Sequence, residues 1–184
     1  MLNTLKNLVR RLISVLRETG LEYAFTGAIA VSFYGVPRTT VDVDIMVMVS
    51  SEEDVDKLVS ALKRAKLKVE KEAIMRVLKS DYRILTIGDE KSPYNVDIIF
   101  SEKKFKKRRG VIFDANTFFQ DPEELVLAKL RMIKATVSRG KAVKDVEDIK
   151  GIIKFTKIDL KRVKLKAEKE GTIETLEEIL TELK

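Results

Sequence analysis

The chain has 184 residues, which is enough for one domain or for a domain with an appendage, and its hydrophobic fraction of 45% is ordinary for a folded protein. It contains no His and no Cys, which excludes Ser-His-Asp and Cys-His catalysis, thiolate zinc sites and disulfides. The net charge of +7 favours anionic partners such as nucleotides or RNA.

The apolar runs of the chain bear on its location. Arg10 and Arg11 interrupt the first apolar stretch, so this stretch does not predict a secretory signal. No apolar run approaches the ~18 residues of a membrane-spanning helix. We therefore expect a cytoplasmic protein without membrane association. The charged fraction of 35% favours a thermophilic source.

The first two thirds of the chain predict helices and strands that alternate, because the hydrophobic period switches between about 3.6 and 2 residues. In chain order, we expect a helix over 3–19 that stops at Gly20, a strand over 21–26, a helix over 27–34, a strand over 41–48, a helix over 51–66, strands over 67–72, 75–79, 82–87, 94–100 and 111–113, and a turn over 88–93.

Gly27 and Ala28 lie where the first predicted strand meets the following helix. A glycine at such a junction lets a ligand approach the backbone, and the free N–H groups of a first helical turn bind phosphate. The pair therefore predicts a phosphate cradle. The alternative is a glycine that only permits close packing.

Acidic residues occur inside two of the predicted strands. In the strand over 41–48, Asp42 and Asp44 share one face, while Val41, Val43, Ile45 and Val47 share the other. Two carboxylates this close are costly to bury without a cation, so they predict a metal site. Asp97 stands alone in the apolar run over 94–100, where an edge-strand aspartate that faces solvent is the alternative.

The last third of the chain predicts helices. Asp121 and Pro122 form a strong helix start, with an N-cap residue followed by proline at the first helical position. The predicted helices cover 122–137, 142–154, 159–170 and 172–183, with a break near Gly140. The pattern changes from β-rich to helical near 119–121. This change predicts an α/β core over 1–120 and a helical C-terminal subdomain over 121–184 that packs on the core.

Six basic residues crowd the segment Lys103–Arg109 directly after the Asp97 strand. RNA or the triphosphate of a nucleotide would find a favourable field there. A solvated loop without a ligand is the alternative.

The order Gly27-Ala28, then Thr39-Thr40-Val41-Asp42-Val43-Asp44, then Asp97 resembles the nucleotidyltransferase superfamily, which has the DNA polymerase β-like fold. This residue pattern is most similar to that of the minimal prokaryotic branch of the superfamily, which includes the AbiEii-like toxins of toxin–antitoxin systems. The resemblance implies an α/β (α+β) fold in which helices flank a mixed, twisted sheet, with a helical C-terminal part. Ala28 is a departure, because the family often has Ser or Gly there.

The resemblance also implies a reaction and its residues. Such proteins move a nucleoside monophosphate from a nucleotide triphosphate to a hydroxyl of RNA, protein or a small molecule, and release pyrophosphate. Mg²⁺ or Mn²⁺ is expected on Asp42, Asp44 and Asp97, and Asp97 is expected to orient or deprotonate the attacking hydroxyl. The nucleotide is expected to contact Gly27, Ala28, Arg38, Thr39, Thr40 and Lys129.

The alternative for Arg38 is an ion pair with a nearby acid, and the alternative for Lys129 is a stem that only crosses the edge of the core. The segment 144–148 suits ion pairs that attach the C-terminal helices. Two other functions also compete with the enzyme. One is a non-catalytic, nucleotide-binding or antitoxin-like protein of the same fold that acts by binding a cognate protein partner. The other is a basic RNA-binding module.

Overall fold

The computed structural model describes residues 2–136 and 139–183. The chain forms two compact units. The first unit comprises Met1–Ala30 and Thr39–Gln120, and the second comprises Val31–Arg38 and Asp121–Lys184. The helical unit therefore includes a short segment from the N-terminal part of the sequence. None of the helices in the described ranges is long and apolar enough to cross a membrane.

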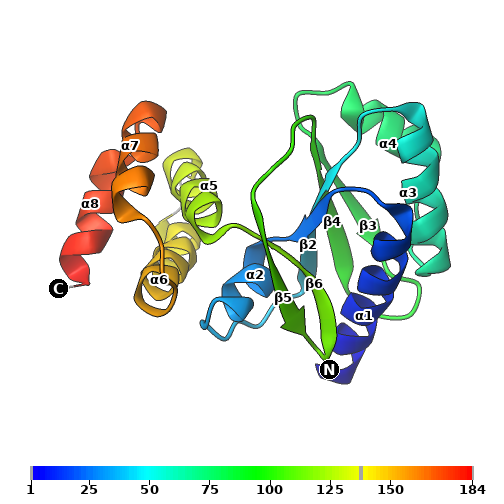
Figure 1. Cartoon of the computed structure of the whole chain (residues 1–184), viewed down its shortest axis with the longest axis horizontal. Helices are drawn as coiled ribbons and strands as arrows, with labels where there is room; N and C mark the ends of the chain where they lie inside the picture. Colours follow the sequence, from blue (N-terminus) through cyan, green and yellow to red (C-terminus); the bar gives the residue numbers. More distant parts are fainter. Residues whose placement is uncertain (1, 137–138, 184) are drawn as a thin grey trace. The chain divides into compact units, whose positions relative to one another are not determined.

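The first unit is built on a six-stranded mixed sheet (Figure 1). The strand order is β3-β4-β2-β1-β6-β5, so β3 and β5 are the edges. β2 runs parallel to β4 and β1 runs parallel to β6, while the other neighbours are antiparallel. The strands are β1 Tyr23–Phe25, β2 Asp42–Met48, β3 Ile84–Gly88, β4 Asn95–Ser101, β5 Lys107–Ile112 and β6 Ala115–Gln120.

Three helices cover one face of this sheet: α1 Leu2–Thr19, α3 Glu52–Arg64 and α4 Lys71–Leu78 (Figure 1). Side chains of β2 and β4 alternate between this buried face and a half-exposed face. The buried ones include Val43, Ile45, Val47, Val96, Ile98 and Phe100. Because the strand period is two residues, Asp42, Asp44 and Asp97 lie on the other face, which we call the carboxylate face.

Most predicted elements of the first unit are confirmed, but residues 67–79 are not. These residues hold an isolated bridge at Leu67 and then α4, instead of the two predicted strands. Short apolar runs cannot distinguish a strand from a helix by period alone. Ile74 and Leu78 are four residues apart, and Ile74 is buried on the inner side of the helix. The helical period therefore matches the burial better than the strand period does.

A hairpin replaces the short predicted strand over 111–113. β5 and β6 pair from Lys107 with Gln120 to Ile112 with Ala115, and two residues with positive φ, Phe113 and Asp114, form the turn. Non-glycine residues rarely adopt such angles, so the sequence carries no turn signal here. Val41 is a further correction, because it precedes β2 and is 73% exposed instead of facing the core.

The second unit contains four C-terminal helices: α5 Pro122–Ala135, α6 Arg139–Phe155, α7 Leu160–Glu170 and α8 Ile173–Glu182. The predicted start of α5 is confirmed, because the Asp121 side chain accepts a hydrogen bond from the backbone N–H of Glu123. The predicted separation of α5 and α6 near Gly140 is confirmed, but α6 already begins at Arg139, so Gly140 itself lies in the helix. Residues 137 and 138 lie outside the described part.

Segment 31–38 belongs to the helical unit through contacts with α6. A Cβ on Gly151 would lie 2.1 Å from Cγ2 of Val36, so only glycine permits this approach. Thr156 Oγ1 donates a hydrogen bond to the carbonyl of Tyr34 at 3.1 Å. This segment follows α2 Gly27–Phe33, whose first residues belong to the first unit.

Candidate active site on the carboxylate face

The carboxylate face brings together the three acidic residues singled out in the sequence. Asp44 on β2 lies directly opposite Asp97 on β4 in the parallel register, and Asp42 lies two residues earlier on β2. All three are half-buried. Residues that lie opposite each other on neighbouring strands are adjacent on one face of a sheet. The site therefore has two acidic groups side by side and a third one step along the strand.

Thr86 on β3 completes the row Asp44–Asp97–Thr86 across three neighbouring strands. Thr86 is paired with Asp97 in the antiparallel register, and its Oγ1 donates a hydrogen bond to Asp97 Oδ1 at 2.6 Å. No sequence motif marks Thr86 as a site residue. In the sequence, Thr86 is only a threonine within the predicted strand over 82–87, and the β-propensity of threonine explains its presence. The pairing with Asp97 depends on strand order.

Gly27 lies against the carboxylate of Asp44. Its φ is +54°, and a Cβ at this position would lie 2.0 Å from Asp44 Oδ2. The backbone N–H of Thr26 donates to the carbonyl of Asp44 at 3.0 Å, which ties the start of α2 to β2. The predicted glycine junction and the predicted carboxylate strand are thus direct neighbours. Ala28 follows in the first turn of α2.

The two threonines before β2 occupy different environments. The Thr40 hydroxyl donates to the carbonyl of Asp42 at 2.7 Å and accepts from its N–H at 3.2 Å. This local motif shapes the entry to β2 and occupies the hydroxyl. Thr39 is exposed. Contact of either residue with a nucleotide stays a prediction.

Arg38 and Lys129 belong to an ion-pair network inside the second unit. Lys129 Nζ lies 2.8 Å from Asp145 Oδ1 and 2.7 Å from Asp148 Oδ2, and Arg38 Nη1 contacts Asp148 Oδ1. Asp148 is 1% exposed and Lys129 is 9% exposed. Buried charges persist only when they are paired in this way. The structure thus shows ion pairs at the predicted segment 144–148, and nucleotide contacts of Arg38 and Lys129 stay predictions.

The donor chemistry of the carboxylate face suits a hard divalent cation such as Mg²⁺ or Mn²⁺. Among residues 2–136 and 139–183, no group of three or more acidic side chains is placed to hold a metal ion by itself. Mg²⁺ commonly takes one or two carboxylates and completes its shell with water and substrate phosphates. The residues therefore fit an ion that is shared between carboxylates and a bound nucleotide.

Basic and aromatic side chains share the carboxylate face at the β5 edge. Phe25 pairs with both Ile45 and Phe119, so Phe119 faces the helices. Strand alternation turns position 118 to the other side, while the Phe118 ring also packs edge-to-face against Tyr23 at 5.8 Å between ring centres. Arg109 lies opposite Phe118 and is exposed. Lys107 Nζ lies 4.1 Å from the centre of the Phe118 ring.

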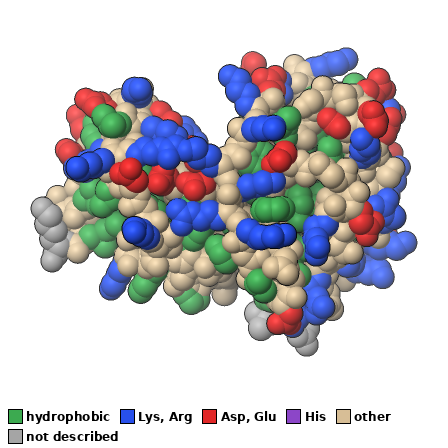
Figure 2. Space-filling model, viewed as in Figure 1, with side chains coloured by type: hydrophobic (Ala, Val, Ile, Leu, Met, Phe, Trp, Pro, Cys, Tyr) green, Lys and Arg blue, Asp and Glu red, His purple; other side chains and the backbone are tan. Residues whose placement is uncertain are grey.

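Figure 2 shows Lys and Arg side chains gathered in a column over β5 and the segment before it. Lys107 also forms an ion pair with Glu22, whereas the exposed Arg109 makes no ion pair or side-chain hydrogen bond with the residues that the structure describes. Part of the predicted basic loop is therefore an ordered edge strand.

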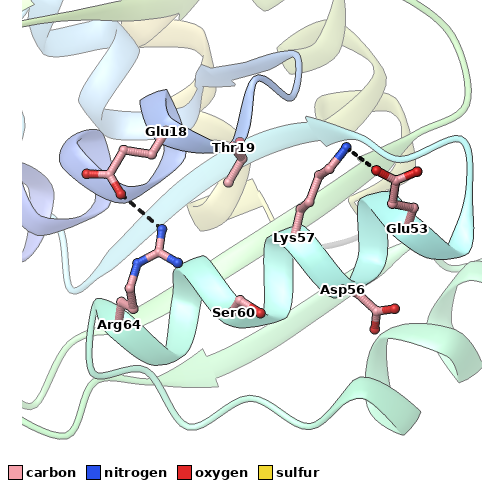
Figure 3. Close-up of a pocket in the computed structure, with 7 residues that line it drawn as sticks. All are labelled: Glu18, Thr19, Glu53, Asp56, Lys57, Ser60 and Arg64. Atoms are coloured by element: carbon pink, nitrogen blue, oxygen red, sulfur yellow. Dashed lines mark hydrogen bonds and ion pairs between the residues drawn. The ribbon is translucent and has the colours of Figure 1, made fainter.

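A charged hollow elsewhere on the first unit does not belong to this site. It lies between α1 and α3 and is drawn in Figure 3, where Arg64 pairs with Glu18 and Lys57 pairs with Glu53. Its fifth charged residue, Asp56, pairs with Lys71, and none of its lining residues comes from the sheet. The carboxylate face is therefore the better candidate for chemistry.

The fold is similar to that of known proteins. The solution structure of the antibiotic-resistance factor ANT(2'')-Ia matches with a TM-score of 0.67 and 14% identity, over 100% of this chain and 96% of that chain. The crystal structure of an antigenic nucleotidyltransferase-like protein from Paracoccidioides brasiliensis matches with a TM-score of 0.56 and 19% identity, over 82% of this chain and 76% of that chain. The predicted fold class is confirmed. A comparison with curated proteins found no match.

A comparison with family models addresses the enzyme class. The model described as nucleotidyl transferase AbiEii toxin, type IV toxin–antitoxin system, matches residues 11–182. The match includes Gly27, the Asp42–Asp44 pair, Asp97 and the four C-terminal helices. The suspected resemblance is confirmed, and the chain belongs to the AbiEii family of nucleotidyl transferase toxins.

Proposed function

We propose that this protein transfers a nucleoside monophosphate from a nucleotide triphosphate to a hydroxyl acceptor in a reaction that depends on a divalent metal ion. The observation that carries the proposal is the pairing of Asp44 with Asp97 on one sheet face, with Gly27 against Asp44. Family membership supports nucleotide transfer in general. The metal and the acceptor are the parts that we add.

The proposed transfer forms one bond and breaks one bond. The acceptor oxygen attacks the α-phosphorus, the bond from that phosphorus to the oxygen that bridges to the β-phosphate breaks, and pyrophosphate leaves with that oxygen. Asp97 orients the acceptor hydroxyl and receives its proton. A divalent ion, held by Asp42 and Asp44 and aided by Asp97, would neutralise charge on the phosphates when bound.

The two cations of the second unit differ in what they can offer a nucleotide. Arg38 contacts Asp148 through Nη1, and its side chain is 24% exposed. Lys129 Nζ contacts two carboxylates, and its side chain is 11% exposed. A guanidinium has five donors, so Arg38 keeps donors for a phosphate, whereas Lys129 is committed to the acids. Within the second unit, Arg38 is therefore the cation that remains available to an anion, and Lys129 serves the ion-pair network.

We propose RNA as the acceptor class, with the β5 edge as its docking strip. Lys107, Arg109 and Phe118 lie on the carboxylate face, where cations can follow a phosphate backbone and an aromatic ring can stack on a base. RNA also supplies the hydroxyl that the reaction needs. Since the family is defined by type IV toxin–antitoxin systems, a cognate antitoxin is the expected protein partner.

The decisive experiment follows labelled phosphate. The protein is incubated with Mg²⁺ or Mn²⁺, each α-³²P-labelled triphosphate and total RNA, with the protein itself as the alternative acceptor. Asp44→Asn serves as the test variant. Asp81→Asn is the matched control, because Asp81 is exposed and lies outside the sheet.

We expect label on RNA with the wild-type protein and with Asp81→Asn, and none with Asp44→Asn or after addition of EDTA. Label on the protein instead of on RNA would identify the protein itself as the acceptor. The absence of transfer with every acceptor and both metals would contradict the enzyme proposal and favour a non-catalytic binding role.

A further inference from the structure

Thr86 is an exposed residue on the edge strand β3, and it is hydrogen-bonded to Asp97, the carboxylate of the candidate site that lies nearest to that edge. Its hydroxyl donates to Asp97 Oδ1 at 2.6 Å. Asp97 has Asp44 as its neighbour on one side of the sheet register and Thr86 as its neighbour on the other. Thr86 is therefore the member of the row Asp44–Asp97–Thr86 that lies on the edge strand.

The hydrogen bond leaves the two oxygens of Asp97 in different situations. Oδ1 accepts from Thr86, while Oδ2 accepts no hydrogen bond from the residues that the structure describes. An O–H···O⁻ bond of this length is charge-assisted and stronger than a neutral one. Threonine has a restricted χ1, so its hydroxyl holds a fixed direction better than a serine hydroxyl does. The carboxylate is thus restrained at one oxygen and open at the other.

β-propensity explains a threonine in a strand, and water can satisfy the hydroxyl of an exposed threonine. Neither explains why the Thr86 hydroxyl is directed at Oδ1 of Asp97. We infer that Thr86 is a positioning residue. It engages Oδ1 of Asp97 and keeps Oδ2 available to the acceptor hydroxyl or to a metal ion. The inference rests on the proposed function, because it assigns Thr86 to the same site.

The test compares Thr86→Val, which keeps the shape and loses the donor, with Thr86→Ser, which keeps the donor. Ser101→Ala is the matched control. Ser101 lies on β4, on the carboxylate face four residues beyond Asp97, and its hydroxyl donates only to the backbone carbonyl of Lys103. Steady-state kinetics of nucleotide transfer and thermal unfolding are measured for all four proteins.

At saturating metal, we expect Thr86→Val to lower kcat about tenfold with the KM for the nucleotide within about twofold, because the excess metal offsets weaker metal binding and the orientation of Asp97 then acts mainly in the transition state. Thr86→Ser should retain kcat within about threefold, and Ser101→Ala should equal the wild type. The four melting temperatures should agree, since Thr86 and Ser101 are not buried. A wild-type kcat in Thr86→Val, or an equal loss in Ser101→Ala, would overturn the inference.

A second readout separates this inference from the proposed function. Binding of Mn²⁺ in the presence of a non-hydrolysable nucleotide is followed by the electron paramagnetic resonance signal of the free ion. Thr86→Val should bind Mn²⁺ severalfold more weakly, and Thr86→Ser should be close to wild type. If the wild-type protein transfers no nucleotide, the proposed function fails and this titration alone decides the inference. Equal Mn²⁺ affinity in Thr86→Val and wild type would then overturn it.

Discussion

At the residue scale, the candidate site depends on one close approach. Gly27 lies so near Asp44 that a side chain at position 27 would occupy the place of the carboxylate oxygen. The positive φ of +54° at Gly27 disfavours other residues for a second reason. Gly27 therefore leaves room for the Asp44 carboxylate, in addition to the phosphate contact that the sequence predicts.

Gly27→Ala should displace the Asp44 carboxylate and abolish transfer. Strain at a left-handed position costs about 1–3 kcal/mol, so the free energy of unfolding should fall by a similar amount. Urea unfolding and the labelling assay measure both effects. Gly88→Ala is the control, because a Cβ there would meet its nearest atom at 3.9 Å. Equal activity in the two variants would show that the contact is dispensable.

Asp148 is the residue on which the ion-pair network of the second unit depends. Asp148→Ala should leave Lys129 with Asp145 as its one remaining acidic partner among the described residues, and Arg38 without its carboxylate. Removal of one member of a buried pair costs about 3–5 kcal/mol, and we expect a loss of unfolding free energy near the lower value. Glu147→Ala, which removes only exposed pairing with Lys150, should cost under about 1 kcal/mol. Urea titrations of both variants check the contrast.

At the scale of elements, the β5–β6 hairpin places basic residues where the sequence alone shows only a basic run. Pairing with β6 orders Lys107 and Arg109, and the alternation of the strand directs both to the carboxylate face. An edge strand rich in cations also resists pairing with another chain. Protection of the edge is thus a second possible role of the charges, and RNA binding distinguishes the two.

Arg109→Gln should weaken binding of single-stranded RNA, and the slope of log K against log salt should fall by about one, because one phosphate contact is lost. Fluorescence anisotropy with a labelled oligonucleotide at several salt concentrations measures both quantities. Arg10→Gln changes the charge equally on α1, away from the sheet face, and should leave the slope unchanged. If both variants lose the same affinity, the strip has no special role and net charge alone attracts RNA.

At the scale of the whole molecule, we expect a fold that is stable without the metal ion. The core of the first unit consists of apolar side chains between the sheet and three helices, and no acidic cluster among the described residues resembles a structural metal site. A metal that arrives with substrate is a ligand of the reaction, in contrast to structural zinc, whose binding drives folding.

Chelation with EDTA should therefore abolish transfer without lowering the melting temperature of the free protein. Addition of Mg²⁺ together with a nucleotide should raise the melting temperature, because ligands that bind only the folded state stabilise it. Differential scanning fluorimetry with and without each component measures these shifts. A large drop in melting temperature with EDTA alone would reveal a structural ion instead.

The sequence by itself determined the local features of this protein. Hydrophobic period, caps and glycines predicted α1, β1, α2, β2, α3, β4 and the start of α5, since each depends on neighbours within a few residues. The Gly27, Asp42–Asp44 and Asp97 pattern also led to the family. Residues 67–79 and the β5–β6 hairpin were missed, because their local patterns are ambiguous and packing against distant elements decided their form.

Only the tertiary structure decided the long-range relations. The register that sets Asp44 opposite Asp97, and Asp97 opposite Thr86, joins strands about 50 and 11 residues apart. The inclusion of 31–38 in the helical unit depends on its contacts with α6, more than 100 residues later. Such contacts leave no periodic trace in a single sequence, because the free energy that selects them comes from burial and pairing between segments that meet only in the folded chain.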